Sequence, residues 1–442
     1  MRKAAFHNLG CKVNSYETEA MQQLLEHAGY EIVPFQEGAD VYVINTCSVT
    51  NIADRKSRQM LHRAKKMNPD AVVVAAGCYV QAAGEALKKD EAIDIVIGNN
   101  KKVDLPAILE EYFACQSEQE TVIDISQTKE YEPLKIEKIE DHTRAFLKVQ
   151  DGCNQFCSYC IIPYTRGRAR SRSIGDVVEE VEKLAAAGYQ EIVLTGIHLT
   201  SYGIDFPEGE KETLLGLILR LHEIDGIKRI RMGSLEPRVI TPEFAHTLAG
   251  LPKICPHFHL SLQSGCDATL KRMNRHYTTK DYLERCDLLR EAFGNPAITT
   301  DVIVGFPGET QEEFETTRAF LEQVGFYEMH VFKYSRRQGT RAAVMEDQVP
   351  ESVKADRSDV LMELDRNMSK HYREQFLGKE VQALMEEKLV FDQKEYLIGH
   401  TKEYIKVVIP YEEGRKGTTV TGTLQCFLND EILLLSENDR KF

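Results

Sequence analysis

The sequence predicts an α/β protein built from three successive parts, and three observations support this prediction. The chain has 442 residues, which is too long for one hydrophobic core and favours two or three domains. Over most of its length, short apolar runs alternate with helical patterns, as in parallel sheets covered by helices. Residues 376–442 instead hold short strand-like runs separated by turn residues, which is typical of a small antiparallel β-barrel.

Residues 1–115 are expected to form an open, mostly parallel α/β sheet of the Rossmann or flavodoxin-like kind. The strand-like runs are 4–9, 41–45, 71–77 and 94–98. Helical patterns follow them near 15–28, 51–67, 82–89 and 103–114. The next segment, 116–138, is polar and irregular, so we expect a linker that crosses a domain surface.

Residues 139–375 predict an incomplete, TIM-like (β/α)6 barrel that is open on one side. Six strand-like runs recur at 145–150, 191–196, 228–233, 257–262, 299–305 and 328–334. Helical patterns lie between them, near 174–188, 213–225, 241–250, 278–293 and 310–324. A further helical stretch, 350–377, precedes the last part, whose strand-like runs are 381–387, 396–401, 404–410, 418–425 and 431–437.

Composition excludes some classes of protein. The net charge of −14 argues against diffuse binding to nucleic acids, although two basic stretches, 55–66 and 166–172, can supply a local groove. We find no apolar run of membrane-spanning length and no secretory signal, so we expect a cytoplasmic, reduced protein that is a monomer by default. In that setting eleven cysteines favour metal binding or catalysis over disulfides.

Three of the cysteines lie within the segment CNQFCSYC, directly after the first strand of the expected barrel. They are Cys153, Cys157 and Cys160. A closed zinc site needs a fourth ligand, and none lies close in sequence. Three thiolates can instead hold a [4Fe–4S] cluster and leave one iron open to a reactant. The spacing therefore predicts an iron–sulfur cluster at the end of the barrel where such enzymes build their active sites.

A second set of cysteines is spread through the first 115 residues. Cys11, Cys47 and Cys78 each follow an apolar strand-like run. Because the carboxyl ends of parallel strands share one edge of a sheet, we expect the three sulfurs to converge there. The second set therefore predicts another three-cysteine iron–sulfur cluster, again with one open iron.

The segment CNQFCSYC after a strand resembles the cluster motif of the radical S-adenosylmethionine (SAM) superfamily. With the three separated cysteines before it and a TRAM-like barrel after it, essentially the whole chain resembles the methylthiotransferases. The resemblance implies that the first cluster cleaves SAM to a radical, the auxiliary cluster carries the inserted sulfur, and a further SAM donates the methyl group. It also implies an external electron donor, a sulfur source and SAM contacts at Thr195, Gly196, Ser234, Glu236 and Gly305.

The segments 7–14, 194–203 and 330–340 resemble the branch that acts on N6-threonylcarbamoyladenosine in tRNA. This implies a tRNA anticodon stem-loop as partner and 2-methylthio-N6-threonylcarbamoyladenosine, modified at C2 next to the anticodon, as product. Two other branches remain alternatives: one acts on isopentenyladenosine in tRNA, the other on an aspartate of a ribosomal protein. A non-enzymatic RNA-binding protein with structural zinc is a third alternative.

Four arginines at every second position follow the CNQFCSYC segment: Arg166, Arg168, Arg170 and Arg172. In an extended strand they would share one face, where we expect them to hold tRNA phosphates around a splayed base. His198 is expected to line the same pocket. Residues 378–442 hold more Asp and Glu than Lys and Arg, which departs from the RNA-contact role of this barrel in the family. No catalytic residue is expected beyond the cluster ligands.

Overall fold

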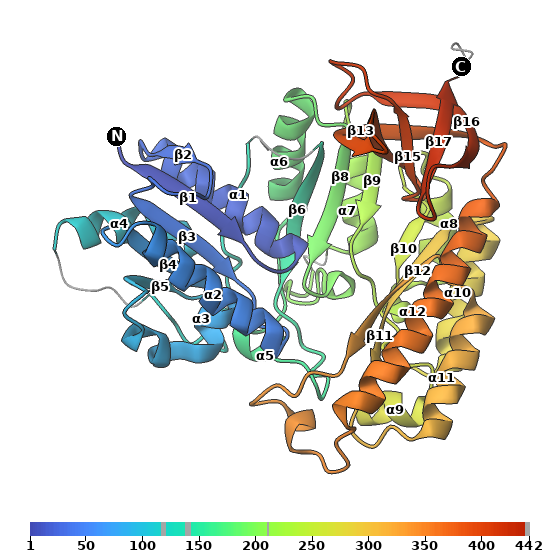
Figure 1. Cartoon of the computed structure of the whole chain (residues 1–442), viewed down its shortest axis with the longest axis horizontal. Helices are drawn as coiled ribbons and strands as arrows, with labels where there is room; N and C mark the ends of the chain where they lie inside the picture. Colours follow the sequence, from blue (N-terminus) through green and yellow to red (C-terminus); the bar gives the residue numbers. More distant parts are fainter. Residues whose placement is uncertain (116–120, 138–142, 210–211, 438–442) are drawn as a thin grey trace.

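The computed structural model describes residues 1–115, 121–137, 143–209 and 212–437, apart from the side chain of Glu85. Parts of the predicted linker (116–120 and 138) and the predicted boundary at 139 lie outside the described residues. Three sheet systems follow one another along the chain: an open sheet, an open barrel and a small closed barrel (Figure 1). The predicted α/β fold class is therefore confirmed.

The open sheet is wholly parallel and has the strand order β2-β1-β3-β4-β5. Its strands are β1 (Lys3–Asn8), β2 (Glu31–Val33), β3 (Val41–Thr46), β4 (Val72–Gly77) and β5 (Ile95–Ile97). This is the flavodoxin-like order, in which the chain switches direction across the sheet between β1 and β3. The sequence pattern missed only the edge strand β2, which is three residues long.

Helices cover both faces of this sheet. They are α1 (Lys12–His27), α2 (Asn51–Met67), α3 (Cys78–Ala83) and α4 (Leu105–Phe113), with 3-10 turns η1 (Gly84–Lys89) and η2 (Lys102–Asp104). Leu25 of α1 and Leu109 of α4 pack on one face, while Leu61 of α2 and Val80 of α3 pack on the other. The predicted helix at 82–89 is thus largely a 3-10 turn.

The open barrel contains six parallel strands, as the sequence predicts. They are β6 (Arg144–Asp151), β8 (Glu191–Gly196), β9 (Arg229–Met232), β10 (His257–His259), β11 (Ala297–Val304) and β12 (Glu328–Lys333). A two-residue strand, β7 (Arg170–Ser171), pairs antiparallel with β6. Bridges Ile230–Ile254 and Leu235–Leu260 join the two halves of the barrel. No described strand pairs with the free edge of β12, so the barrel is open there.

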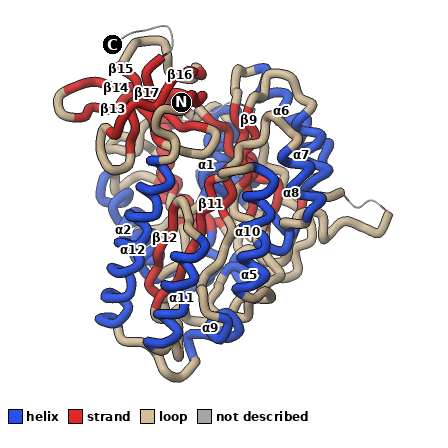
Figure 2. Tube along the Cα trace, turned by 90° about the vertical axis from the view of Figure 1, so that its right-hand side faces the viewer, coloured by secondary structure: helices blue, strands red, loops and turns tan. Residues whose placement is uncertain are grey.

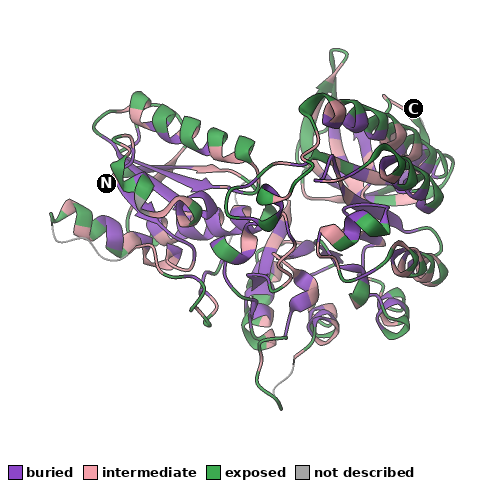
Figure 3. Ribbon diagram, turned by 90° about the horizontal axis from the view of Figure 1, so that it is seen from below, coloured by how far each residue is buried: buried purple, intermediate pink, exposed green. Residues whose placement is uncertain are grey.

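Helices line the outside of the barrel. They are α5 (Ile162–Thr165), α6 (Ile174–Ala186), α7 (Leu214–His222), α8 (Pro242–Ala249), α9 (Asp267–Arg272), α10 (Thr279–Phe293), α11 (Gln311–Val324) and α12 (Glu351–Glu374), with 3-10 turns η3 (Leu199–Ser201), η4 (Pro237–Val239) and η5 (Arg341–Val344). Figure 2 shows α10, α11 and α12 outside β11 and β12. Figure 3 shows the strands largely buried and the outward helix faces exposed. Alternate strand residues therefore face either this helical core or the barrel lumen.

Most of the longer helices begin where the sequence offers a cap. A Ser or Thr side chain accepts a backbone N–H at the start of α2, α6, α7, α8, α10 and α11. At Thr278 and Thr310 the acidic residue three positions later also accepts the backbone N–H of the cap, which completes a capping box. These caps satisfy backbone N–H groups that a helix leaves unpaired at its start. The helix starts predicted from the sequence accordingly agree closely with those in the structure.

The C-terminal barrel is closed, in the order β13-β14-β15-β17-β16. Its strands are β13 (Glu380–Phe391), β14 (Lys394–Thr401), β15 (Lys406–Pro410), β16 (Thr419–Phe427) and β17 (Ile432–Glu437). The β15–β17 pair is parallel, so the prediction of a wholly antiparallel barrel is wrong at this pair. Five strands cannot alternate in direction around a closed ring, because an odd number forces one parallel pair. Arg229 and Arg231 of β9 donate to barrel carbonyl groups and so dock it on the open barrel.

A buried ion-pair network joins the open sheet to the open barrel. Its centre is Glu17 on α1, whose carboxylate accepts hydrogen bonds from Lys148 Nζ at 2.7 Å and Arg166 Nη1 at 2.9 Å. Lys102 Nζ lies 3.0 Å from the same carboxylate. Asp151 adds a second carboxylate, 2.7 Å from Lys148 Nζ and 3.0 Å from Arg166 Nη1. We call these five residues the Glu17 network.

The segment 121–137 is more deeply packed than a surface linker. Leu134 and Ile136 belong to the main hydrophobic core, and Glu132 accepts the backbone N–H groups of Lys102 and Val103. The segment therefore packs between the open sheet and the barrel, beside the Glu17 network. No helix in the described part of the chain is long and apolar enough to span a membrane.

From the Glu17 network we predict how the free energy of unfolding depends on Glu17. Burial alone would raise the pKa of the Glu17 carboxyl, but the surrounding cations hold it well below its usual value of 4.5. We expect Glu17→Gln to cost about 3–5 kcal/mol, because it leaves buried cations without their partner. Equilibrium urea unfolding followed by circular dichroism measures this cost.

The matched control is Glu179→Gln on α6, where the carboxylate is exposed and pairs only with exposed lysines. We expect it to leave the free energy of unfolding almost unchanged, because exposed ion pairs contribute little. The stabilisation by Glu17 is complete above its unfolded pKa and is lost as the pH falls through its lowered folded pKa. Equal stability of the two variants would contradict the central place of Glu17.

Candidate functional site

The first cysteine set lies on the loop after β6, at the carboxyl end of the barrel. The Cys153 N–H donates to the Gly167 carbonyl at 3.0 Å, and the Cys160 N–H donates to the Cys157 carbonyl at 3.0 Å. Burial, together with the neighbouring Cys157 sulfur, raises the pKa of Cys153 to about 11 and that of Cys160 to about 12. The three sulfurs therefore lie within electrostatic reach of one another, as ligands of one cluster must.

A guanidinium lies beside this set. Arg275 Nη1 donates to the Cys157 sulfur at 3.3 Å. Three converging thiols next to a cation fit an anionic iron–sulfur cluster, because iron binds thiolates and the cation stabilises their charge. The pKa of His198, lowered to about 4 by burial, is also affected by Glu236 and Arg275. Cys153 responds to the same two charges, so His198 and Glu236 lie near the first cysteine set.

The predicted SAM contacts lie along the same carboxyl edge. Thr195 and Gly196 end β8, and a Cβ atom on Gly196 would lie 3.0 Å from Gln150, so the position favours glycine. Ser234 is exposed just after β9, whereas Glu236 is buried and accepts a hydrogen bond from Arg238 Nε at 2.7 Å. His198 Nδ1 lies 2.7 Å from Ser201 Oγ, while its buried Nε2 has no partner among the described protein groups.

Gly305 follows β11, at a position where only a residue without a side chain fits. Its φ of +70° lies in the left-handed region, and a Cβ atom would lie 2.2 Å from Lys354 Cγ. Its N–H donates to Glu309 Oε1 at 2.9 Å, which holds the turn in place. The backbone at the end of β11 is therefore fixed where the sequence predicts a SAM contact.

The second cysteine set meets at the carboxyl edge of the open sheet. Cys11 follows β1, Cys47 follows β3 and Cys78 follows β4. Burial raises the pKa of Cys47 to about 11, and the sulfurs of Cys78 and Cys11 act in the same direction. The convergence that the sheet topology predicts is therefore present, and it lies at the switch point between β1 and β3.

Close packing around the second set fixes its geometry. A Cβ atom on Gly10, whose φ is +114°, would lie 3.1 Å from the Cys47 sulfur. Cys78 accepts hydrogen bonds from Arg166 Nε at 3.2 Å and from Asn99 Nδ2 at 3.6 Å. Three converging thiols with a guanidinium beside them repeat the donor set of the first site. They too fit an iron–sulfur cluster.

Three of the four arginines predicted to hold phosphates do not face solvent. Arg166 is fully buried in the Glu17 network, and Arg172 Nη1 lies 2.6 Å from a Glu180 carboxylate oxygen. Arg170 is buried and donates to the carbonyl groups of Arg166 and Arg168. The prediction of an arginine face for phosphate is therefore wrong for these three residues, because all three are buried and each pairs with a carboxylate, Arg170 with Asp151 at 3.8 Å.

Arg168 is the exception. Its side chain is exposed, and its guanidinium lies 4.5 Å from the ring centre of Phe156, inside the CNQFCSYC segment. The outward face of α2 adds a second group of exposed cations, which are Arg55, Lys56, Arg58, Arg63 and Lys66. Arg168 follows the first cysteine set in the chain and α2 follows Cys47, so both groups of exposed cations lie close in sequence to a cysteine set.

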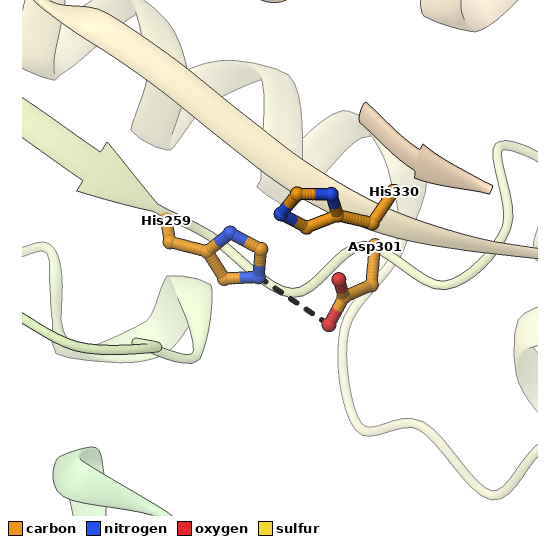
Figure 4. Close-up of side chains that lie close together, drawn as sticks. All are labelled: His259, Asp301 and His330. Atoms are coloured by element: carbon orange, nitrogen blue, oxygen red, sulfur yellow. Dashed lines mark ion pairs between the residues drawn. The ribbon is translucent and has the colours of Figure 1, made fainter. Parts of the chain in front are cut away.

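Polar side chains of the barrel strands form a third group, which no motif in the sequence singles out. His259 Nε2 lies 3.3 Å from Asp301 Oδ2, and the rings of His259 and His330 stack at 5.8 Å between centres (Figure 4). One ligand atom from each lies within 4.8 Å of the others. Thr299 Oγ1 contacts the other nitrogen of His259 at 3.0 Å. The group can hydrogen-bond a polar ligand, and its donor set also suits a divalent cation.

Sequence reasoning also missed Arg275 and Glu17. Arg275 lies in the segment KRMNRH, where nothing separates it from the neighbouring basic residues. Glu17 lies on a helix with several other polar residues, and nothing in the local sequence distinguishes it from them. Both depend on residues more than a hundred positions away, so no local pattern could have identified them.

Comparison with known proteins matches both halves of this arrangement. A profile of the Radical SAM superfamily matches residues 147–321, and one described as Uncharacterized protein family UPF0004 matches residues 3–98. The fold resembles the radical S-adenosylmethionine methyltransferase TsrM from Kitasatospora setae. The TM-score is 0.56 over 75% of this chain and 72% of that one, with 16% identity, which shows the fold alone.

Curated relatives match nearly the whole chain. Threonylcarbamoyladenosine tRNA methylthiotransferase MtaB from Bacillus subtilis (strain 168) is 43% identical, over 95% of this chain and 93% of its own. The protein of the same name from Aquifex aeolicus (strain VF5) is 41% identical, over 87% of this chain and 92% of its own. tRNA-2-methylthio-N(6)-dimethylallyladenosine synthase from Acetivibrio thermocellus is 38% identical, over 86% of this chain and 80% of its own. The chain therefore belongs to the radical SAM tRNA methylthiotransferases.

Proposed function

We propose that this enzyme adds a methylthio group at C2 of N6-threonylcarbamoyladenosine next to the anticodon of tRNA. In this proposal Cys153, Cys157 and Cys160 hold the SAM-cleaving [4Fe–4S] cluster. Cys11, Cys47 and Cys78 hold a second cluster that delivers the sulfur. The observation that supports this most strongly is that two three-thiol sites lie at the carboxyl edges of two adjoining sheets. Arg166 links the two sheets, because it donates hydrogen bonds to Cys78 of the open sheet and to Asp151 at the end of β6. The relatives named for threonylcarbamoyladenosine support the choice of substrate.

When bound, the first cluster and SAM supply a 5′-deoxyadenosyl radical, and the protein positions the reactants. We assign SAM contacts to Thr195, Gly196, Ser234, Glu236 and Gly305 along the carboxyl edge of the barrel. His198 lies near them, and its buried Nε2 has no partner among the described protein groups. This nitrogen can donate a hydrogen bond to SAM or the base, or accept one from them. Product formation also requires an external electron donor and a sulfur source.

The open sheet contacts both sides of the barrel's opening. On one side the Glu17 network joins α1 to β6. On the other, Arg337, beyond β12, places Nη1 2.6 Å from Asp54 on α2, and its Nη2 donates to Ser48 Oγ at 2.8 Å. A nucleotide held between these two contacts would be shielded from water, which protects a radical from side reactions.

We assign tRNA backbone contacts to Arg168 and the exposed face of α2. These cations flank the sites where the two cysteine sets lie, while the C-terminal barrel carries the excess of acidic residues. Base flipping from an anticodon loop needs only local phosphate contacts, because the loop is already single-stranded.

Lys12 is the residue best placed to recognise the threonine carboxylate of the substrate. It begins α1, and its pKa is lowered to about 8, first by burial of the ammonium group and then by Arg144 and Arg231 of the barrel strands. Both arginines pair with carboxylates, at 3.0 and 2.8 Å. Lys12 is exposed and forms no ion pair within the described part of the chain. A free cation beside the barrel wall suits an anionic substituent, which isopentenyladenosine lacks.

The product itself tests the proposed function. Anaerobically reconstituted enzyme with SAM, a reductant and sulfide should convert tRNA carrying N6-threonylcarbamoyladenosine to its 2-methylthio derivative, as read by mass spectrometry of the nucleosides. tRNA carrying isopentenyladenosine serves as the matched control and should remain unmodified. Methylthiolation of the control alone, or of a ribosomal protein instead, would contradict the proposal.

The two cysteine sets should have separable roles. Replacement of Cys153, Cys157 or Cys160 by Ala should abolish cleavage of SAM to 5′-deoxyadenosine, because the open iron that binds SAM is lost. Cys47→Ala should retain SAM cleavage but yield no methylthiolated tRNA. Repeated turnovers to methylthiolated product by Cys47→Ala would refute the assignment of the sulfur to the second site.

Lys12 should select for the carboxylate. We expect Lys12→Gln to lower kcat/KM for a threonylcarbamoyladenosine stem-loop about ten- to a hundredfold, which is the range for a lost charge-assisted hydrogen bond. A stem-loop whose threonine carboxylate is replaced by carboxamide should react equally with both enzymes, and Lys12→Arg should recover the normal substrate. An equal loss on both stem-loops would show that Lys12 acts elsewhere.

A further inference from the structure

Each cysteine set receives one hydrogen bond from one arginine. Arg275 Nη1 donates to the Cys157 sulfur at 3.3 Å, and Arg166 Nε donates to the Cys78 sulfur at 3.2 Å. Among the described residues, no other cysteine of the two sets accepts a hydrogen bond from a charged side chain. The two arginines come from different elements, so the repeated arrangement does not follow from a shared local motif.

Arg275 has a charge that no carboxylate balances. Its Nε donates to Tyr277 Oη at 2.9 Å and its Nη2 to the Ser261 carbonyl at 3.3 Å, and both acceptors are neutral. No acidic residue in the described ranges forms an ion pair with it. A half-buried guanidinium without an anion is costly, so the position suits an anionic cluster held through the sulfur beside it.

Arg166 reaches its sulfur in a different way. Its two terminal nitrogens bond Glu17 and Asp151 at 2.9–3.0 Å, so it is paired with carboxylates, which it shares with Lys102 and Lys148. These bonds fix the plane of the guanidinium and leave Nε directed at the Cys78 sulfur. Arg166 therefore contributes an oriented hydrogen bond, whereas Arg275 contributes a hydrogen bond together with a net positive charge.

We propose that these two arginine–sulfur hydrogen bonds set the reduction potentials of the two cluster sites, Arg275 for the Cys157 site and Arg166 for the Cys78 site. A hydrogen bond to a ligand sulfur withdraws electron density and stabilises the reduced cluster, which raises its potential. Both are positioning residues, because they act through a cysteine and not on a substrate. The inference rests on the proposed function, which makes both sets cluster ligands.

The Arg275 bond is tested in a chain in which Cys11, Cys47 and Cys78 are all Ala, so that only the first site holds iron. An electron paramagnetic resonance (EPR) redox titration measures the midpoint potential of that cluster. Arg275→Gln should shift the midpoint to a more negative value, and Arg275→Lys, which keeps the charge, should shift it less. The matched control is Arg272→Gln, because Arg272 lies three residues away and bonds Glu313 instead of a sulfur.

The Arg166 bond is tested in the complementary chain, in which Cys153, Cys157 and Cys160 are Ala. Arg166→Lys should shift the remaining midpoint to a more negative value, or release the iron of this site while circular dichroism shows an intact fold. The same substitution in the first chain should leave the midpoint of the Cys157 site unchanged, which separates a local effect from a general one.

Unchanged midpoints for both Arg275→Gln and Arg166→Lys, with iron retained, would overturn the inference. So would an equal shift from Arg272→Gln, because that residue contacts no sulfur. Failure of the proposed function gives a different result, since the chain that keeps only Cys11, Cys47 and Cys78 would then bind no iron before any arginine is changed.

Discussion

The arrangement of this enzyme depends on a single buried carboxylate. Glu17 lies on the first helix, yet its partners come from the end of the open sheet, the first barrel strand and the loop after the cluster motif. Each of these groups would be costly to bury alone, and the carboxylates of Glu17 and Asp151 offset most of the charge of the three cations around them. The network therefore fixes where the open sheet lies against the barrel, and hence how the Cys11, Cys47 and Cys78 set lies relative to the other.

This constraint has a direct consequence for chemistry. Under the proposed function, a radical formed at one site and a sulfur delivered from the other must meet at the same carbon, so the relative position of the two sites has to be fixed before the substrate arrives. Arg166 serves both purposes, because it belongs to the Glu17 network and also bonds the Cys78 sulfur. The Arg337 contacts on the far side close the same opening and complete the enclosure.

Much of this fold could be predicted from the sequence, because strand patterns and caps are local. The convergence of three distant cysteines could also be predicted, since the carboxyl ends of parallel strands share an edge. The prediction for Arg166, Arg170 and Arg172 is wrong because their burial depends on tertiary packing, which also brings each of them to a carboxylate. Arg275 and the group of His259, Asp301 and His330 depend on tertiary contacts that no sequence period records. The parallel pair in the last barrel follows from strand number and closure, and closure is not visible in a sequence.

The most direct test of the account is the iron and acid-labile sulfide content of anaerobically purified protein, measured beside the variant in which Cys153, Cys157 and Cys160 are Ala. Two independent [4Fe–4S] sites predict about eight irons in the wild type and about four in the variant. About four irons in the wild type and none in the variant would contradict the account, because Cys11, Cys47 and Cys78 would then hold no cluster and the sulfur would need another source.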